Sequence, residues 1–183
     1  KLNISSKIVF LVTGGIILGG GLLTKLFYFI DGQGVPLLEC FFLVVSSRTA
    51  GFDNVGLFLD TPGSVQALLI FTMYVGASPA STGGGIKTTT FFVVLAVVAA
   101  FIRGKRPSFS YKSISQQTIL KAFVLIIFSI LYILVAVTVI SAIEGEKMTV
   151  SDILFEVVSA FSTTGLSLGI TPSLTAASKL ILC

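Results

Sequence analysis

Long and short apolar runs alternate along this chain. Residues 8–30 and 118–143 are each apolar for more than 20 residues, which is enough for a helix to cross a hydrocarbon core of about 30 Å. Residues 64–102 are apolar for 39 residues, and one helix of that length would measure about 58 Å. Residues 76–85 interrupt this run with three consecutive glycines and a proline, which are poor helix formers. The pattern predicts two clean spans and two half-helices joined by an intramembrane loop.

Two further apolar runs, residues 36–47 and 151–161, are too short to span a membrane. Their length fits re-entrant helices that enter and leave on one side. Pro36 suits a first helical position, and Ser151 or Asp152 suits an N-cap.

Each short run ends in a Thr-x-Gly turn. The order of span, short helix, turn and span therefore occurs twice, in residues 1–103 and 118–183, with a basic linker at 104–117 and a last span beginning at Pro172. The sequence predicts an all-α membrane protein built from a repeated unit of span, pore helix and span.

Composition narrows the function. Apolar residues make up 54% of the chain and charged residues 11%, whereas a soluble domain carries about a quarter charged residues. The chain has no His, which removes the commonest general base and metal ligand, so we expect neither an enzyme nor a cofactor held by this chain. Cys40 and Cys183 stand alone without CxxC spacing, and we interpret both as small buried hydrophobes.

Charge is distributed by side of the membrane. One side carries Lys1, Lys7, Arg103, Lys105, Arg106, Lys112 and Lys121, and the other side or the short runs carry Asp31, Glu39, Asp53, Asp60, Glu144, Glu146, Asp152 and Glu156. The positive-inside rule places the linker in the cytoplasm. The acids then form an outer rim that concentrates cations. The net charge of +4 thus reports topology, and we expect no nucleic-acid partner.

The paired turns are the candidate ion site. Non-helical backbone at membrane depth is tolerated only where it is buried in protein or lines a water-filled cavity. Repeated Thr-x-Gly turns therefore favour a filter whose carbonyls replace the hydration shell of potassium, with glycine free to take positive φ. The expected filter residues are Thr49, Ala50, Gly51, Thr163, Thr164 and Gly165. Ordinary turns between packed helices are the alternative. Arg48 either anchors the filter backbone or senses the acidic rim.

The glycine-rich loop is the candidate gate below this filter. A phosphate-binding loop is excluded because Gly and Lys must be adjacent there, and Ile86 separates them. A packing kink is the alternative. Lys87 lies near mid-membrane, where ionisable residues are costly and functional, so we expect it to bond carbonyls, hydroxyls or an external carboxylate, or to act as a cationic latch. The expected gate residues are Gly76, Ala77, Ser78, Pro79, Ala80, Ser81, Thr82, Gly83, Gly84, Gly85 and Lys87.

Three strings carry a family resemblance: Ser-Arg-Thr-Ala-Gly-Phe (47–52), Gly-Ala-Ser-Pro-Ala-Ser-Thr-Gly-Gly-Gly-Ile-Lys-Thr-Thr (76–89) and Phe-Ser-Thr-Thr-Gly-Leu (161–166). They closely resemble the Trk/Ktr/HKT potassium transporter superfamily, with KtrB membrane subunits as the nearest branch, over essentially the whole chain. The resemblance implies four M1-P-M2 repeats around one pore. This chain is similar to the third repeat and part of the fourth, so the remaining repeats must complete the pore.

The resemblance also implies partners and a location. It implies a multi-pass protein of the bacterial plasma membrane, a homodimer of pore subunits among membrane lipids, and a KtrA-like cytosolic ring that binds ATP or ADP. Potassium, or sodium, would be the transported or coupling ion. The absence of the first two repeats and the cut in the last helix are departures from the family pattern. A sodium-coupled secondary carrier with broken helices is the alternative function.

Overall fold

The computed structural model describes residues 3–57, 61–109, 112–145 and 148–183. It is helical apart from one antiparallel pair of two-residue strands, β1 (Ser108–Phe109) and β2 (Lys112–Ser113). The helices are α1 (Ile4–Ile30), α2 (Leu37–Ser46), α3 (Gly63–Tyr74), α4 (Thr88–Ile102), α5 (Gln116–Glu144), α6 (Val150–Phe161), the 3-10 turn η2 (Thr171–Ser173) and α7 (Ala176–Leu182).

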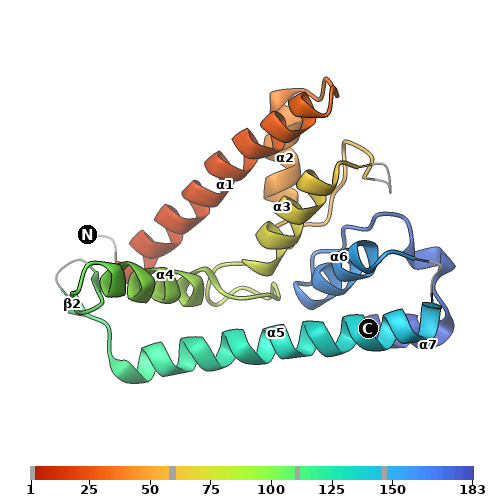
Figure 1. Ribbon diagram of the computed structural model, residues 1–183. Helices are drawn as coiled ribbons and strands as arrows, with labels where there is room; N and C mark the ends of the chain where they lie inside the picture. The colour runs from red at the N-terminus through yellow and green to blue at the C-terminus, as the bar shows by residue number, and fades with distance from the viewer. Residues whose placement is uncertain (1–2, 58–60, 110–111, 146–147) are drawn as a thin grey trace.

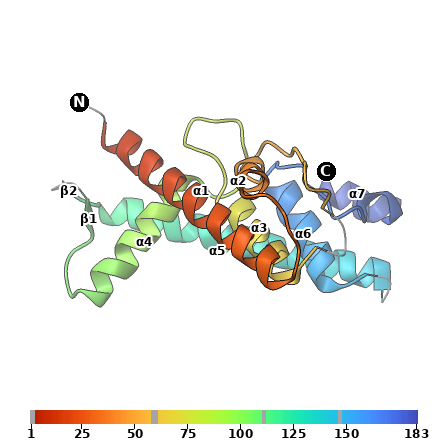
Figure 2. The ribbon, with the colours of Figure 1, turned by 90° about the horizontal axis from the view of Figure 1, so that it is seen from above.

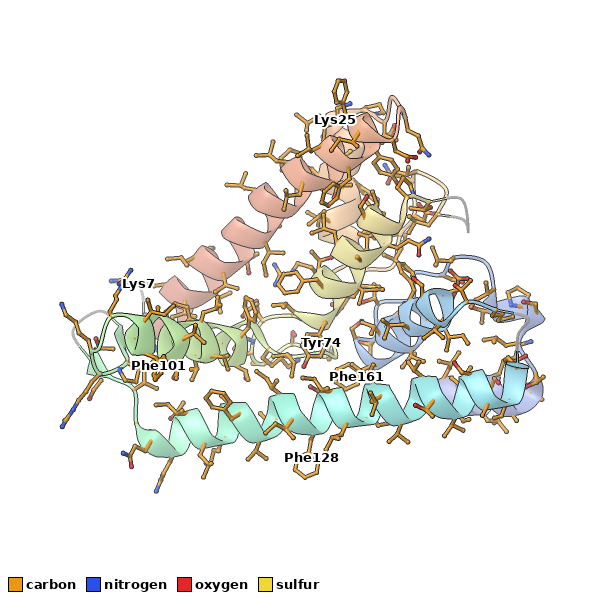
Figure 3. All side chains as sticks on the ribbon, in the orientation of Figure 1. Lys7, Lys25, Tyr74, Phe101, Phe128 and Phe161 are labelled. Atoms are coloured by element: carbon orange, nitrogen blue, oxygen red, sulfur yellow. The ribbon has the colours of Figure 1, made fainter. Side chains whose placement is uncertain are left out.

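Two helices are long and apolar enough to cross a membrane, Ser5–Ile30 within α1 and Gln116–Glu144 of α5. Only 22% and 17% of their most apolar windows are buried within the chain. The core helix of a soluble protein would be mostly covered, so these exposed apolar faces suit lipid or other membrane segments. Figure 3 shows Phe128 pointing away from the body of the protein on the outer face of α5.

The broken helix is confirmed. α3 ends at Tyr74 and α4 begins at Thr88, with the glycine-rich loop between them. The linker departs from expectation, because the strand pair forms inside it and α5 already begins at Gln116.

Three helix starts differ from the sequence predictions. Pro36 is the N-cap of α2, which begins at Leu37, and the starts of α6 and α7 are set by threonines. Thr149, one residue before α6, is the N-cap, and its Oγ1 accepts a hydrogen bond from the Asp152 N–H at 3.3 Å. The last helix does not begin at Pro172, which lies in the 3-10 turn. The helix begins after Thr175, whose side chain caps it. In α6 and α7 a threonine hydroxyl satisfies backbone donors that are otherwise unpaired in the first turn.

The two halves share one core. Figure 1 shows α1, α2 and α3 grouped above the long α5, with α6 beside α3 and above α5. In the view from above, α1 crosses over α5 (Figure 2). Leu43 of α2, Leu69 of α3 and Phe155 of α6 are fully buried in this core. α1 approaches α2 closely at two glycines, since a Cβ on Gly20 would lie 2.9 Å from Val44. The small residues of α1 thus permit close packing of the first short helix, which positions the turn that follows it.

Candidate functional site

The two Thr-x-Gly turns leave the C-terminal ends of α2 and α6 with matching backbone. Thr49 has a φ of 71° and Gly51 of 75°, and Thr163 and Gly165 have φ values of 54° and 86°. A β-branched residue at positive φ is uncommon, and its presence at the same position of both turns marks a shared conformation. The positive φ expected at the glycines is confirmed.

A serine of each short helix holds the backbone just beyond the turn. The Ser46 hydroxyl donates to the Phe52 carbonyl, and the Ser159 hydroxyl donates to the Leu166 carbonyl at 2.6 Å. Phe52 and Leu166 directly follow the two turn glycines. Sequence reasoning missed these ties, although a serine near the end of each short apolar run was a visible signal.

The two turns touch each other. The Thr164 hydroxyl donates to the Ser47 carbonyl at 3.2 Å. A Cβ on Gly51 would overlap the Thr164 carbonyl oxygen, so that oxygen lies directly against Gly51. Glycine is required here both for its φ and for the close approach of another backbone.

The loop at 76–85 sits against both turns. The Gly84 N–H donates to the Thr163 Oγ1 at 2.7 Å, and a Cβ on Gly84 would lie 2.6 Å from the Phe161 carbonyl oxygen. On the other side, a Cβ on Gly83 would lie 2.7 Å from the Thr49 Oγ1. The glycines at 83 and 84 therefore let the loop backbone lie directly on residues 49 and 161–163.

Two cations hold the loop. The Arg48 Nη2 donates to the Gly76 carbonyl at 3.1 Å, where the loop begins. The Lys87 Nζ donates to the carbonyls of Ser81, at 3.3 Å, and Gly83. Bonding of Lys87 to carbonyls is confirmed. Arg48 differs from both expectations, because its described side-chain bond goes to the loop, to neither the filter backbone nor an acid.

The acids do not form a uniform outer rim. Asp31 and Asp53 are exposed, whereas Glu144 and Glu156 are only 4% and 6% exposed. Asp60, Glu146 and Lys1 lie outside the described residues. The buried carboxylates accept hydrogen bonds from the segments after the second turn, because burial of a charge requires donors around it.

Glu156 binds the chain just beyond the second turn. It accepts from the Ser167 hydroxyl at 2.6 Å, the Leu168 N–H at 3.1 Å and the Thr171 hydroxyl at 2.9 Å. Glu144 accepts from the N–H and hydroxyl of Thr175, both at 2.9 Å, and from the Ser178 hydroxyl at 2.6 Å. Glu156 thus fixes the segment that leaves the second turn, and Glu144 fixes the start of α7; the charge pattern alone did not reveal either role.

The ligands available for a cation are oxygens. Among the described residues no group of three or more His, Cys, Asp or Glu side chains is placed to hold a metal ion. Cys40 is buried as expected, but Cys183 is exposed. Backbone carbonyls and threonine hydroxyls of the turns are hard oxygen donors, which suit alkali cations and not soft metals.

Comparison with known proteins identifies the family of the chain. A family model described as TrkH, cation transport protein, matches residues 2–183. The potassium/sodium uptake protein NtpJ of Enterococcus hirae is 33% identical over 100% of this chain and 42% of its own length. The Ktr system potassium uptake protein B of Bacillus subtilis is 37% identical over 80% of this chain and 32% of its own length.

The fold is also found in a solved structure. The potassium transporter TrkH from Vibrio parahaemolyticus superposes with a TM-score of 0.68 and 23% identity, over 97% of this chain and 40% of that one. The chain thus spans about two fifths of the length of NtpJ and of the solved transporter. With the family model matched along nearly all of its length and relatives above 30% identity, this chain belongs to the TrkH family of cation transport proteins.

Proposed function

We propose that the chain forms part of a pore for potassium uptake, in which carbonyls of the two turns hold the dehydrated ion. The observation that carries the proposal is the pair of turns with the same unusual backbone, in contact with each other at Gly51 and Thr164. Related proteins are named as potassium, or potassium/sodium, uptake proteins. Transport requires no catalytic side chains, which fits a site made of backbone carbonyls and hydroxyl groups.

The short helices supply the electrostatics. α2 and α6 both end where the turns begin, so each places the negative end of its dipole next to the proposed ion path. Carbonyls must converge to replace a hydration shell, and two turns form only part of such a ring. Further M1-P-M2 repeats of the whole protein would supply the rest.

The loop at 76–85 is the proposed gate. It lies against both turns through Gly83 and Gly84 and is tied at its start by Arg48. Opening would break the hydrogen bond between Gly84 and Thr163 and let the loop swing out of the path, a local order change typical of switching segments.

A cytosolic partner would control the gate in the proposed assembly. A homodimer of pore subunits in the bacterial plasma membrane would dock on a cytosolic KtrA-like ring that binds ATP or ADP. The exposed cations at the end of α4 and in the linker, Arg103, Lys105 and Arg106, face the cytoplasm in this arrangement. The names of the Ktr system relatives support a system of several components.

The filter is tested with a matched pair of glycines in the full-length protein, expressed in a bacterium that lacks its own potassium uptake. Gly51→Ala and Gly32→Ala impose the same backbone strain, since φ is 75° and 77°, but only Gly51 has a carbonyl against its Cα. The Gly51→Ala variant should either fail to support growth at low potassium or lose the preference of the transporter for potassium over sodium. Uptake and selectivity equal to those of Gly32→Ala would refute the filter.

A sodium-coupled carrier is the second candidate, because the broken helix between α3 and α4 is also a feature of carriers. The two differ in energetics. In proteoliposomes, a pore conducts potassium down its gradient without sodium, whereas a coupled carrier accumulates potassium only when a sodium gradient is imposed.

A further inference from the structure

A groove runs between α1 and α4, and no residue of the two turns or of the loop at 76–85 lines it. Its volume is about 510 Å³, within the range of small-molecule sites. Its walls are apolar along most of its length, and its mouth is basic. The residues that line it include Gly15, Phe92, Ala96, Ala99, Arg103 and Lys105.

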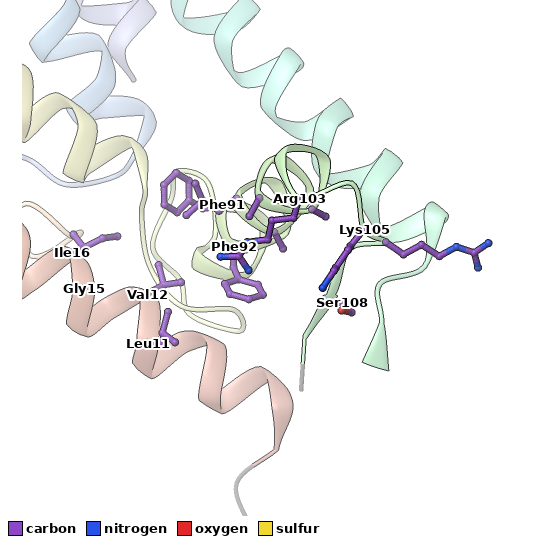
Figure 4. A pocket seen from close by; sticks show the side chains of 14 residues that line it. Leu11, Val12, Gly15, Ile16, Phe91, Phe92, Arg103, Lys105 and Ser108 are labelled. Atoms are coloured by element: carbon purple, nitrogen blue, oxygen red, sulfur yellow. The ribbon is translucent and has the colours of Figure 1, made fainter. Parts of the chain in front are cut away.

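Small residues leave this groove open. A Cβ on Gly15 would have no other atom within 4 Å, and Ala96 and Ala99 face the same space from α4. Figure 4 shows Arg103 extending from the end of α4 toward Phe92, and Lys105 extending toward Ser108. Among the described lining residues none is acidic, so the mouth of the groove attracts anions.

We propose that this groove binds an anionic phospholipid, with one acyl chain between α1 and α4 and the phosphate at Arg103 and Lys105. The groove matches the two parts of such a lipid. The apolar slot along the membrane helices suits an acyl chain, and the cations at the end of α4 suit the phosphate headgroup. Burial of acyl CH₂ groups and attraction of a phosphate to each nearby Arg or Lys act together at this point.

Other occupants fit less well. A soluble phosphate would use the cations but leave the slot empty, and an extended peptide segment would bury unpaired backbone polar groups against apolar walls. The proposal rests on the membrane fold of the chain, and neither the filter nor the gate enters it. Because α4 directly follows the loop at 76–85, a bound lipid would brace the helix that carries the loop.

The test uses the full-length protein in nanodiscs that contain phosphatidylglycerol and phosphatidylcholine. Native mass spectrometry should detect retained phosphatidylglycerol in preference to phosphatidylcholine. Arg103→Gln with Lys105→Gln should lower that retention about 25-fold, at roughly fivefold per cation. Lys121→Gln, an exposed cation outside the groove on the same predicted side, should leave it unchanged.

A second pair of variants fills the slot and keeps the charges. Gly15→Leu should lower lipid retention, whereas Gly14→Leu, next to it but outside the groove and equally free of neighbours, should not. A photoreactive acyl chain should label peptides from residues 11–16 and 91–100. Equal retention in all four variants, labelling of other segments, binding of inorganic phosphate in place of lipid, or cross-linking of the slot to another part of the same protein would overturn the proposal.

Discussion

The seating of the loop at 76–85 can be tested with one methyl group. Gly84 does not have a positive φ, so Gly84→Ala adds no backbone strain and acts through sterics alone. The new Cβ would lie 2.6 Å from the Phe161 carbonyl oxygen and 2.8 Å from the Ser162 carbonyl carbon. Both are backbone atoms at the end of α6, which cannot rotate away as a side chain would.

The size of the effect follows from the overlap. The distance of 2.6 Å is about 0.8 Å short of ordinary van der Waals contact. A shift of about that size would also stretch the 2.7 Å bond from Gly84 to Thr163 to the limit of hydrogen bonding. Overpacking costs about 1–3 kcal/mol, and a lost hydrogen bond about 1 kcal/mol. A net loss of about 2 kcal/mol moves the closed-to-open equilibrium roughly 30-fold.

We therefore expect Gly84→Ala to raise basal potassium flux at least tenfold in proteoliposomes of the full-length protein without any regulator. Gly63→Ala is the matched control, because a Cβ at the start of α3 meets nothing within 4 Å. A melting temperature near that of the wild type would show that the variant is folded. Flux at or below the wild-type level in that folded variant would refute the idea that the seated loop is the barrier.

Three further predictions concern single side chains. Thr163→Val removes the hydroxyl that accepts the Gly84 N–H and should raise basal flux several-fold, whereas Thr163→Ser should not; equal flux in both would assign the hydroxyl no role. Arg48→Gln loses a charge-assisted hydrogen bond to the Gly76 carbonyl, worth roughly 1.5–3 kcal/mol, and should raise flux at least tenfold, whereas Arg48→Lys should raise it less. A fall in flux in both variants would mean that Arg48 acts on the ion path and does not hold the loop closed. Glu156→Ala leaves the buried Leu168 N–H unpaired and should lower stability by about 3 kcal/mol in thermal unfolding, against about 1 kcal/mol for Glu156→Gln; equal melting temperatures would contradict the role assigned to Glu156.

The elements of the fold were largely predictable from local signals. Apolar run length gave the spans at 8–30 and 118–143 and the two short helices, because hydrophobic thickness fixes how many residues a span requires. The break at 76–85 was predictable because Gly and Pro disfavour helix wherever they stand. The strand pair at 108–113 was not, since its two-residue strands carry no periodic pattern.

The site was predictable as a list of residues and not as an arrangement. Thr163 and Gly84 are 79 positions apart and Thr164 and Ser47 are 117 apart, and nothing local to either member specifies such a pairing. The prediction of an acidic outer rim was wrong for the same reason. The charge pattern placed Glu144 and Glu156 on the outer side or in the short apolar runs, but whether a carboxylate faces water or hydroxyl donors depends on segments that fold back from later in the chain.

The contact between the turns has a direction, and this bears on the proposed pore. Gly51 faces the carbonyl of Thr164, but its counterpart Gly165 has no other described atom within 4 Å of a Cβ placed on it. In a ring of like turns each glycine faces the carbonyl of the next turn in the same sense. Gly165 would then face a turn from another repeat, and the glycine of a preceding turn would face the carbonyl of Ala50, the counterpart of Thr164. The exposure of Ala50 and Gly165, at the two open edges of this pair, is what that ring requires.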